Sequence, residues 1–292
     1  MVTLGETSLP RIGLGTNRLA NTPENVAFIQ QAVAAGIRLI DTAHVYASGE
    51  SEETIGAALS QVPEGCVVAT KGGYGTGNGR PAVLSAQIEE SLRRLQADSI
   101  GLYYLHKVDP ETPLEDSLSV IKEYKDRGSI QHVGVSNVSV EQVEQAQQVV
   151  PVDAVQNHYN LAERTHEDVV DYCADNGIVF VPYFPLRADG GSAVAEIAGR
   201  HGATPAQITL AWLLRRSPAM FPIPGTLSLE HLRENLAAGE IELTDDEFEA
   251  LRYKAATSAG SRFRTGRTVT AGRSRTAPRL GRASTSRCCW NG

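Results

Sequence analysis

Short apolar segments recur along the first 250 residues, separated by longer segments in which apolar and polar positions mix. The short segments contain few polar residues and many β-branched ones. Near-continuous apolar runs of this length are typical of strands buried on both faces of a parallel sheet. We expect strands at Ile37–Asp41, Cys66–Thr70, Ile100–Leu105, Ile130–Ser136, Val152–Gln156, Ile178–Tyr183 and, with a weaker pattern, Met220–Ile223.

The longer segments have the spacing and the end signals of helices. In the first of them, Thr22 and Pro23 stand where an N-cap and a first helical residue are expected, and Gly36 stands at the end. The predicted helices cover residues 22–36, Pro81–Leu95, 112–128, Val140–Val149, Thr165–Asn176, Thr204–Leu214 and Leu229–Ala238.

A strand followed by a helix therefore repeats seven or eight times, which indicates an α/β protein with a parallel sheet. Two domains, or one doubly wound sheet, fit this alternation. The number of repeats and the length near 250 residues favour a (β/α)8 TIM barrel over residues 1–254, and no Pro/Gly/Ser-rich linker divides this region. We expect an N-terminal β-hairpin at Ser8–Gly15, outside the repeat.

The last part of the chain, residues 255–292, has a different composition. It contains eight arginines and no Asp or Glu, and Gly, Ser, Thr and Ala fill most of the rest. Such a segment cannot bury enough apolar surface to fold, so we expect a disordered, low-complexity basic tail. A tail without a role, a tail that binds polyanions and an end produced by a shifted reading frame all remain open.

Charge and cysteine content exclude several classes of protein. The formal charge is −7, and residues 1–260 alone carry 34 acidic and 19 basic side chains, a charge of −15. We therefore expect no nucleic-acid partner. The four cysteines show no C-x-x-C spacing, and no apolar run approaches the roughly 20 residues of a membrane helix. These features predict a cytoplasmic protein with reduced thiols and no membrane association.

Polar residues follow the predicted strands at the point where each strand ends. Asp41 and then Tyr46 follow the first strand, Lys71 the second and His106 the third. The carboxyl ends of barrel strands meet at one face, so these side chains can converge on one pocket. Further polar residues at the strand ends are Ser136, Asn137, Gln156, Asn157 and Tyr183.

The first four of these residues suit proton donation to a carbonyl oxygen. A nearby ammonium group lowers the pKa of a phenol, and Lys71 stands where it can do so for Tyr46. Asp41 can hold Lys71 charged, and His106 can donate to the substrate oxygen or tune Tyr46. The alternative is a structural Asp41–Lys71 ion pair beside a packed tyrosine.

The same residues lie in motifs that resemble those of the aldo-keto reductase superfamily. The segment from Asp41 to Tyr46 is similar to its D-T-A-x-x-Y motif, and Lys71 and His106 match its strand-end lysine and histidine. Further matches are the G-V-S-N ending at Asn137, V-Q-N-x-Y-N at 155–160, I-P-G-x at 223–226 and E-N at 234–235. The matches occur in order between residues 12 and 251.

The resemblance implies a barrel that binds NADPH, or NADH, without a Rossmann domain and reduces small aldehydes and ketones. It implies a catalytic tetrad of Asp41, Tyr46, Lys71 and His106, with Tyr46 as the proton donor. The residues that it implies for cofactor binding are Gly15, Thr16, Asn17, Asp41, Ser136, Asn137, Gln156, Tyr183, Leu186, Ile223, Gly225, Thr226, Ser228, His231, Arg233, Glu234 and Asn235.

Among these residues, Ser136, Asn137 and Gln156 would hold the carboxamide, and Tyr183 would stack on the nicotinamide. Leu186 and the segment that starts at Ile223 would line the pyrophosphate and ribose path.

The positions that bind the 2′-phosphate and adenine in the superfamily are less well matched. Many members have a Lys in the I-P segment and an Arg one turn into the next helix, where this chain has Gly225 and His231. Thr226, Ser228 and Arg233 are nearby, and Glu234 and Asn235 would bind the adenine. NADPH is expected from the family, and NADH remains open.

Two alternative functions also remain open. One is a cofactor-sensing or assembly protein similar to channel β-subunits, because the connection after His106 is short and gives few clues to a substrate. The other is a metal-dependent barrel hydrolase, since several histidines lie near strand ends, although no H-x-H or H-E-x-x-H pair occurs. We expect no metal. Many members of the superfamily are monomers, so we expect a monomer.

Overall fold

The computed structural model describes residues 1–59, 62–187 and 191–252. The expectations for the basic tail at 255–292 lie outside the described residues. Within those residues, no helix is both long enough and apolar enough to cross a membrane.

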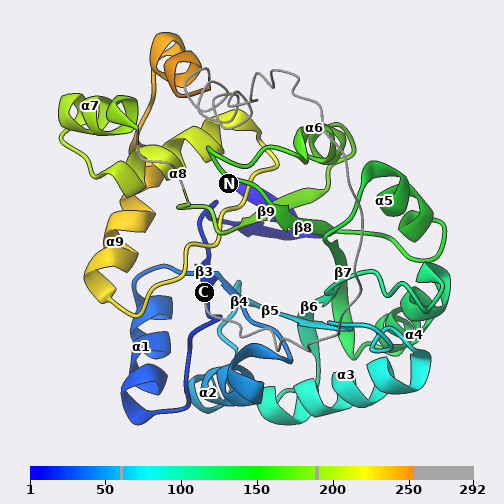
Figure 1. The fold of residues 1–292 in the computed structure, drawn as a ribbon. Helices are drawn as coiled ribbons and strands as arrows, with labels where there is room; N and C mark the ends of the chain where they lie inside the picture. Colours follow the sequence, from blue (N-terminus) through cyan, green and yellow to red (C-terminus); the bar gives the residue numbers. More distant parts are fainter. Residues whose placement is uncertain (60–61, 188–190, 253–292) are drawn as a thin grey trace, which may run out of the picture.

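Seven parallel strands, each hydrogen-bonded to the next in chain order, form the central sheet (Figure 1). This order results when each strand is followed by a helix that returns the chain to the same edge. The strands are β3 (Leu14–Gly15), β4 (Leu39–Asp41), β5 (Val67–Gly72), β6 (Ile100–Leu105), β7 (Ile130–Ser136), β8 (Ala154–His158) and β9 (Val179–Tyr183).

The segment around Pro222 closes the sheet into a barrel. On one side, the N–H of Gly13 donates to the carbonyl oxygen of Pro222 at 3.0 Å. On the other side, the N–H of Phe221 donates to the carbonyl oxygen of Phe180 at 2.8 Å. The segment forms only isolated bridges and not a regular strand, because Pro222 and Pro224 have no N–H for the ladder. The predicted eight-stranded barrel is thus confirmed, with an irregular eighth position.

Helices surround the barrel on its outside (Figure 1). They are α1 (Pro23–Ala34), α2 (Glu50–Ala58), α3 (Pro81–Leu95), α4 (Leu114–Asp126), α5 (Val140–Gln147), α6 (Glu167–Asp175), α7 (Ser192–His201), α8 (Pro205–Arg216) and α9 (Leu229–Ala237). The other helical elements are two 3-10 turns, η1 (Tyr46–Gly49) and η2 (Ala238–Glu240), and helical residues 245–252.

Side-chain caps explain several helix starts. The Thr22 hydroxyl accepts a hydrogen bond from the N–H of Asn25 at the start of α1. Capping boxes begin α5 at Ser139 and α8 at Thr204. In each box the cap side chain and a glutamine three residues later satisfy each other's backbone N–H groups. Each of these helices therefore begins where the sequence predicted, to within one residue or two.

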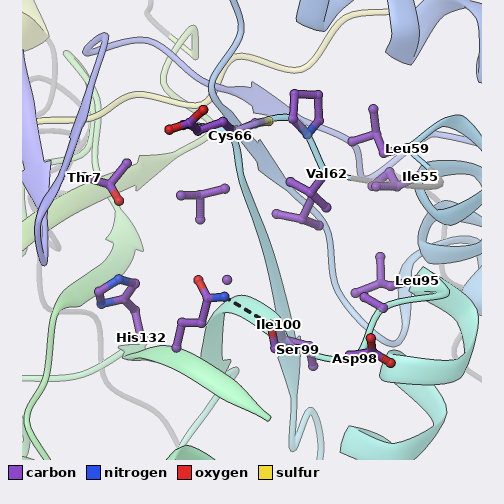
Figure 2. A pocket seen from close by; sticks show the side chains of 18 of the residues that line it. Thr7, Ile55, Leu59, Val62, Cys66, Leu95, Asp98, Ser99, Ile100 and His132 are labelled. Atoms are coloured by element: carbon purple, nitrogen blue, oxygen red, sulfur yellow. Dashed lines mark hydrogen bonds between the residues drawn. The ribbon is translucent and has the colours of Figure 1, made fainter. Parts of the chain in front are cut away.

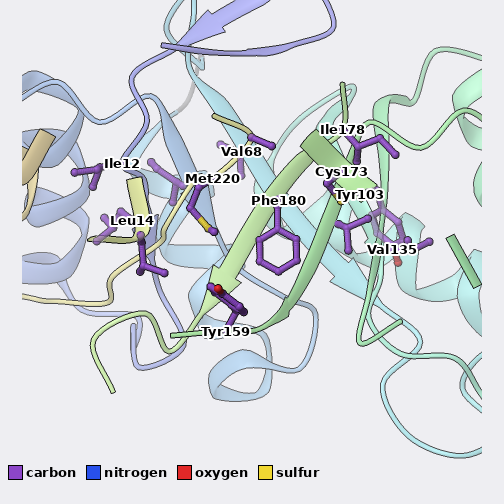
Figure 3. Close-up of a cluster of buried hydrophobic side chains, with 14 of the residues drawn as sticks. Ile12, Leu14, Val68, Tyr103, Val135, Tyr159, Cys173, Ile178, Phe180 and Met220 are labelled. Atoms are coloured by element: carbon purple, nitrogen blue, oxygen red, sulfur yellow. The ribbon is translucent and has the colours of Figure 1, made fainter. Parts of the chain in front are cut away.

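Apolar side chains pack in two layers, one outside the sheet and one inside the barrel. The outer layer lies between strands and helices and includes Phe180, Tyr159 and Met220 (Figure 3). The inner layer fills the barrel with side chains such as Val181 and Leu102. Because both faces of the strands are covered, the strand sequences are almost continuously apolar.

An antiparallel hairpin of β1 (Val2–Leu4) and β2 (Thr7–Leu9) precedes the barrel. The expected hairpin at Ser8–Gly15 was therefore placed too late in the chain. The end of the expected segment, Leu14–Gly15, is β3, which pairs with β4 in the barrel. The hairpin packs its apolar side chains into the inner layer, beside residues at the beginnings of the strands. It closes the amino-terminal end of the barrel and leaves the carboxyl ends for a site.

Two helices were missed by the sequence interpretation. Helix α2 buries small and polar residues, including Ser51, Glu52 and Thr54, so it lacks an apolar stripe. Helix α7 is an additional element between β9 and α8 and is rich in alanine. A pattern built on large apolar residues overlooks both kinds of helix.

We predict that truncation of Leu9 destabilises the barrel. Leu9 is 1% exposed in the inner layer, so Leu9→Ala leaves a cavity and should lower the free energy of unfolding by about 3 kcal/mol. Urea denaturation followed by circular dichroism measures this change. The neighbouring exposed Ser8 gives the control, since Ser8→Ala should change stability by no more than about 0.5 kcal/mol. Equal effects of the two substitutions would show that the packing of Leu9 in the inner layer does not stabilise the barrel.

Candidate active site

A cavity of about 510 Å³ opens at the carboxyl ends of the strands. We call it the strand-end cavity. Three members of the predicted tetrad, Asp41, Tyr46 and His106, line it, and the fourth, Lys71, lies directly behind Asp41. Its other lining residues are Gly15, Thr16, Asn17, Val45, Tyr74, Lys107, Ser136, Asn137, Gln156, Tyr183, Phe184, Pro185, Ile223 and Gly225.

A buried ion pair forms the base of this cavity. Lys71 is fully buried, and its Nζ donates to Asp41 Oδ1 at 2.6 Å and to the carbonyl oxygen of Thr42 at 2.7 Å. Burial alone lowers the pKa of the Lys71 ammonium, but Asp41 and Tyr46 outweigh burial, and the net pKa is raised. Lys71 is therefore charged at neutral pH.

Tyr46 lies beside this ammonium group, with Lys71 Nζ 4.9 Å from the centre of its ring. Burial raises the pKa of the phenol, and Lys71 lowers it by less, so that the net pKa stays above its usual value. We expected a lowered pKa from the ammonium neighbour, and that expectation omitted the cost of burying a phenolate. Tyr46 is therefore protonated at neutral pH and has a proton to give.

His106 completes the tetrad and is uncharged. Burial, and then the positive charge of Lys71, lower the pKa of its imidazole to about 3. Its ring lies edge-on to that of Tyr46, with 6.1 Å between ring centres, and 4.8 Å from that of Tyr74. Its Nδ1 atom is buried without a partner among the described residues. A neutral imidazole is a hydrogen-bond donor at one nitrogen only.

Three polar side chains stand together on the next strand ends. Asn137 has a left-handed backbone, with φ of +60°, and its Nδ2 donates to Ser136 Oγ at 3.0 Å and to the carbonyl oxygen of His106 at 3.1 Å. Gln156 Nε2 donates to Asp41 Oδ2 at 2.8 Å. The structure therefore brings the three predicted carboxamide-binding residues to one wall of the cavity.

Tyr183 forms an aromatic wall beside these groups. Its hydroxyl donates to Asn137 Oδ1 at 2.8 Å. The ring of His158 stacks on it with 5.1 Å between centres and 5° between planes. One face of Tyr183 is thus covered by His158, and the ring is held in a fixed orientation. Phe184 lies edge-on to it, with 5.3 Å between ring centres, and both rings line the strand-end cavity.

A second cavity of about 410 Å³ adjoins the first and shares Gly15, Thr16, Asn17, Phe184, Pro185 and Gly225 with it. It also contains two exposed arginines, Arg18 and Arg187, and we call it the arginine cavity. Its remaining lining residues are Leu19, Leu186, Pro224, Thr226 and Leu227. Leu186 and Thr226 were predicted from the sequence, but both arginines were missed, although Arg18 directly follows the predicted Asn17 and Arg187 directly follows Leu186.

Five predicted cofactor residues belong to α9 or to its N-cap and do not line either cavity. Ser228 is the N-cap of α9, where its hydroxyl accepts from the N–H of His231 at 3.3 Å. His231 and Arg233 are exposed, Glu234 is half-buried and Asn235 is buried. Among the described residues that line the strand-end cavity and the arginine cavity, none of these five is found. Their roles toward a 2′-phosphate and adenine stay predictions.

A buried carboxylate that was not predicted from the sequence contacts the strand residue next to Lys71. Glu52, on α2, is fully buried, accepts from Thr70 Oγ1 at 2.6 Å and pairs with Arg94 at 3.2 Å. Arg94 also donates to the carbonyl oxygen of His44 at 3.1 Å. This network ties α2 and α3 to β5 immediately before Lys71. Two of its members are polar residues within helices, where sequence alone suggests solvent exposure.

A third cavity of about 470 Å³ lies at the opposite, amino-terminal end of β5, β6 and β7. Thr7, Cys66 and His132 lie around it (Figure 2). It contains no residue of the tetrad. In TIM barrels this face contributes to stability, and the chemistry is found at the other face. The described residues include no group of three or more His, Cys, Asp or Glu that can hold a metal ion.

Comparisons with known proteins agree with this geometry. The family model described as "Aldo/keto reductase family" matches residues 11–192 and 188–256. An uncharacterized oxidoreductase of Schizosaccharomyces pombe is 36% identical over 270 residues, which cover 86% of this chain and 88% of that protein. Pyridoxine 4-dehydrogenase of Escherichia coli is 34% identical, covering 85% of this chain and 96% of that protein.

A solved structure shares the fold as well. The aldo/keto reductase from Klebsiella pneumoniae, in complex with NADP and acetate, superimposes with a TM-score of 0.79 and is 31% identical, covering 87% of this chain and 94% of that one. The barrel, the residues at its strand ends and these similarities define an oxidoreductase. The chain belongs to the aldo/keto reductase family.

We predict that His106 stays uncharged in the folded protein down to about pH 4, because the pKa of its imidazole is lowered to about 3. The unfolded chain binds this proton near pH 6.5, so between about pH 6.5 and 3 the unfolded state holds more protons. Folding stability therefore falls as the pH decreases through this window. NMR titration of labelled histidines, with His106→Asn to assign the signal, tests the claim, and a midpoint near 6.5 would contradict it.

Proposed function

We propose that residues 1–254 form one catalytic barrel that reduces small aldehydes and ketones to alcohols with NADPH, and that Tyr46 is its proton donor. The observation that carries this proposal is the protonated Tyr46 beside the buried Lys71–Asp41 pair at the strand-end cavity. NADP in the similar Klebsiella pneumoniae structure supports the choice of cofactor. NADH remains an alternative, because Ser228, His231 and Arg233, which are expected near a 2′-phosphate, do not line either cavity.

The chain's own groups account for the handling of the proton. The Tyr46 hydroxyl donates its proton to the carbonyl oxygen as that oxygen becomes negative, and the phenolate that remains is stabilised by the Lys71 ammonium. Asp41 keeps Lys71 charged and in position. Neutral His106 donates a hydrogen bond from Nε2 to the same oxygen and orients it toward Tyr46.

The cavity also fits a nicotinamide. Bound NADPH supplies the hydride that the carbonyl carbon accepts. Ser136, Asn137 and Gln156 provide donors and acceptors for a carboxamide, and the ring of Tyr183 at the cavity wall gives a flat surface for an aromatic ring. The stacking of His158 on Tyr183 holds this surface in place. A nicotinamide bound on the surface would therefore present its opposite face to the substrate.

Arg18 and Arg187 are the residues that we assign to the cofactor phosphates. Both line the arginine cavity next to the strand-end cavity, and guanidinium groups bind phosphates with paired hydrogen bonds. Residues 1–260 have a charge of −15, which repels a dinucleotide at long range. Local cations therefore have to provide the attraction. Arg233 is kept as the candidate for the 2′-phosphate.

Neither alternative function is favoured by an observation on the described residues. The described residues form no group of three or more His, Cys, Asp or Glu that can hold a metal ion, and none of their features indicates a channel or assembly partner. We further propose a monomeric cytoplasmic enzyme that acts without nucleic acid or membrane. The disordered, low-complexity basic tail expected at 255–292 stays a prediction.

Replacement of Tyr46 tests the proton donor. Tyr46→Phe removes the hydroxyl and should lower kcat for a simple aldehyde at least a hundredfold. The affinity for NADPH, measured by quenching of protein fluorescence, should stay within about twofold, because no cofactor contact is lost. Tyr74→Phe is the matched control in the same cavity and should retain most of kcat. A Tyr46→Phe enzyme with unchanged kcat would refute the mechanism.

Substitution of the arginines tests the cofactor site. Arg18→Met and Arg187→Met should each raise the Kd of NADPH and of NADH to a similar extent, about fivefold to thirtyfold, because a charge-assisted hydrogen bond contributes on the order of 1 to 2 kcal/mol. Arg233→Met should raise the Kd of NADPH and leave the Kd of NADH unchanged. Arg80→Met, at an exposed pair with Glu111 outside both cavities, is the control.

Fluorescence titration with both cofactors separates these outcomes. Unchanged Kd values for Arg18→Met and Arg187→Met would remove the two arginines from the cofactor site. Equal weakening of NADPH and NADH by Arg233→Met would remove the 2′-phosphate assignment of that residue.

A further inference from the structure

The described residues that line the strand-end cavity leave one positive charge without a neutralising partner. Of its described lining residues, Asp41 and Lys107 carry a formal charge at neutral pH, since burial and Lys71 keep His106 neutral. Asp41 is 2% exposed and is already neutralised by Lys71. The charge that remains available to a bound molecule is therefore the single positive charge of Lys107.

Lys107 differs from the other lysines of the structure. Four of the five lysines lie in the described part of the chain, and three of them are ion-paired: Lys71 with Asp41, Lys122 with Asp126 and Lys125 with Asp153. Lys107 has no carboxylate of the described residues within 4.0 Å, although the barrel carries an excess of acidic side chains. It is exposed and follows His106 directly at the cavity wall.

The rest of the cavity rim is apolar. Val45, Tyr74 and Phe184 line the cavity and are 41%, 52% and 41% exposed. They account for three of the seven large hydrophobic side chains that are exposed among the described residues. Exposed apolar side chains gathered at one pocket are typical of a binding surface. The rim thus offers an apolar surface together with one cation.

The position of Lys107 separates it from the phosphates of the cofactor. Arg18 and Arg187 line the arginine cavity, and Lys107 does not. Lys107 follows His106 directly in the chain, and both line the strand-end cavity together with Tyr46. An anion that contacts Lys107 therefore belongs to the molecule whose carbonyl oxygen faces Tyr46 and His106.

We propose that the substrate is a carbonyl compound with an apolar body and an anionic group, a carboxylate or a phosphate, and that Lys107 binds this group. The proposal rests on the carbonyl reductase function given above and adds the substrate class. The reaction itself is unchanged: hydride adds to the carbonyl carbon, Tyr46 protonates the oxygen, and the anionic group takes no part in bond making or breaking.

A pair of aldehydes of nearly equal shape tests the proposal. The anion 4-formylbenzoate and its neutral methyl ester differ in charge and have similar carbonyl groups, and 4-formylphenyl phosphate provides the phosphate arm. Steady-state kinetics are measured for the full-length enzyme, for Lys107→Met and for Lys107→Glu. Lys122→Met on α4, whose ion pair lies outside the cavity, is the matched control.

The proposal predicts a change confined to the anionic substrates. Lys107→Met should raise KM for 4-formylbenzoate or for the phosphate about fivefold, Lys107→Glu should raise it further, and KM for the methyl ester should stay within about twofold. The Kd of NADPH should not change. Added salt should raise KM for the anionic substrate in the parent enzyme, and it should raise this KM much less in Lys107→Met. The arm with the larger change identifies carboxylate or phosphate as the preferred group.

Other results overturn the proposal and leave the proposed function testable by itself. Equal changes for the anion and its ester in Lys107→Met, or no change for either, would refute a role in binding charge while turnover still supports a carbonyl reductase. A raised Kd for NADPH would assign Lys107 to the cofactor. Absence of NADPH oxidation with all three aldehydes in the parent enzyme would contradict the proposed function itself.

Discussion

The buried contact between Asp41 and Lys71 is the interaction on which the site depends. An ammonium group without water is unstable unless an opposite charge lies beside it, and removal of one partner from such a pair costs about 3 to 5 kcal/mol. Asp41 supplies that charge at 2.6 Å, and Gln156 holds the other carboxylate oxygen at 2.8 Å. The pair joins β4, β5 and β8 across the barrel mouth and fixes a positive charge next to Tyr46.

Burial gives the two neighbours of this charge different tasks. Tyr46 is kept protonated because a buried phenolate costs more than Lys71 returns, and His106 is kept neutral because burial and Lys71 act in the same direction. Of these two neighbours, Tyr46 is the one that carries an acidic proton at neutral pH. The acidic barrel repels anions in general, and for that reason we propose Arg18, Arg187 and Lys107 as the local cations that bind phosphates or an anionic substrate.

Sequence patterns predicted most of this architecture because buried parallel strands and amphipathic helices leave distinct periodicities. The strands Ile100–Leu105 and Ile130–Ser136 were predicted with the bounds that the structure has. The hairpin was misplaced because Leu14–Gly15 is too short to identify without its partner β4. Arg18 and Arg187 were missed because their common cavity joins loops that are distant in the chain, and the raised pKa of Tyr46 depends on burial, which no spacing reveals.

The pH dependence of kcat/KM for aldehyde reduction at saturating NADPH tests most directly whether Tyr46 is the acid. A protonated Tyr46 and a neutral His106 predict a rate that is nearly constant from about pH 5 to about pH 9 and falls only where the phenol loses its proton, above its usual pKa near 10. Lys71→Met should move that fall to higher pH, since the phenolate loses its stabilising charge. A decline with an apparent pKa near 6.5 in the parent enzyme would assign the proton to a histidine and contradict the account.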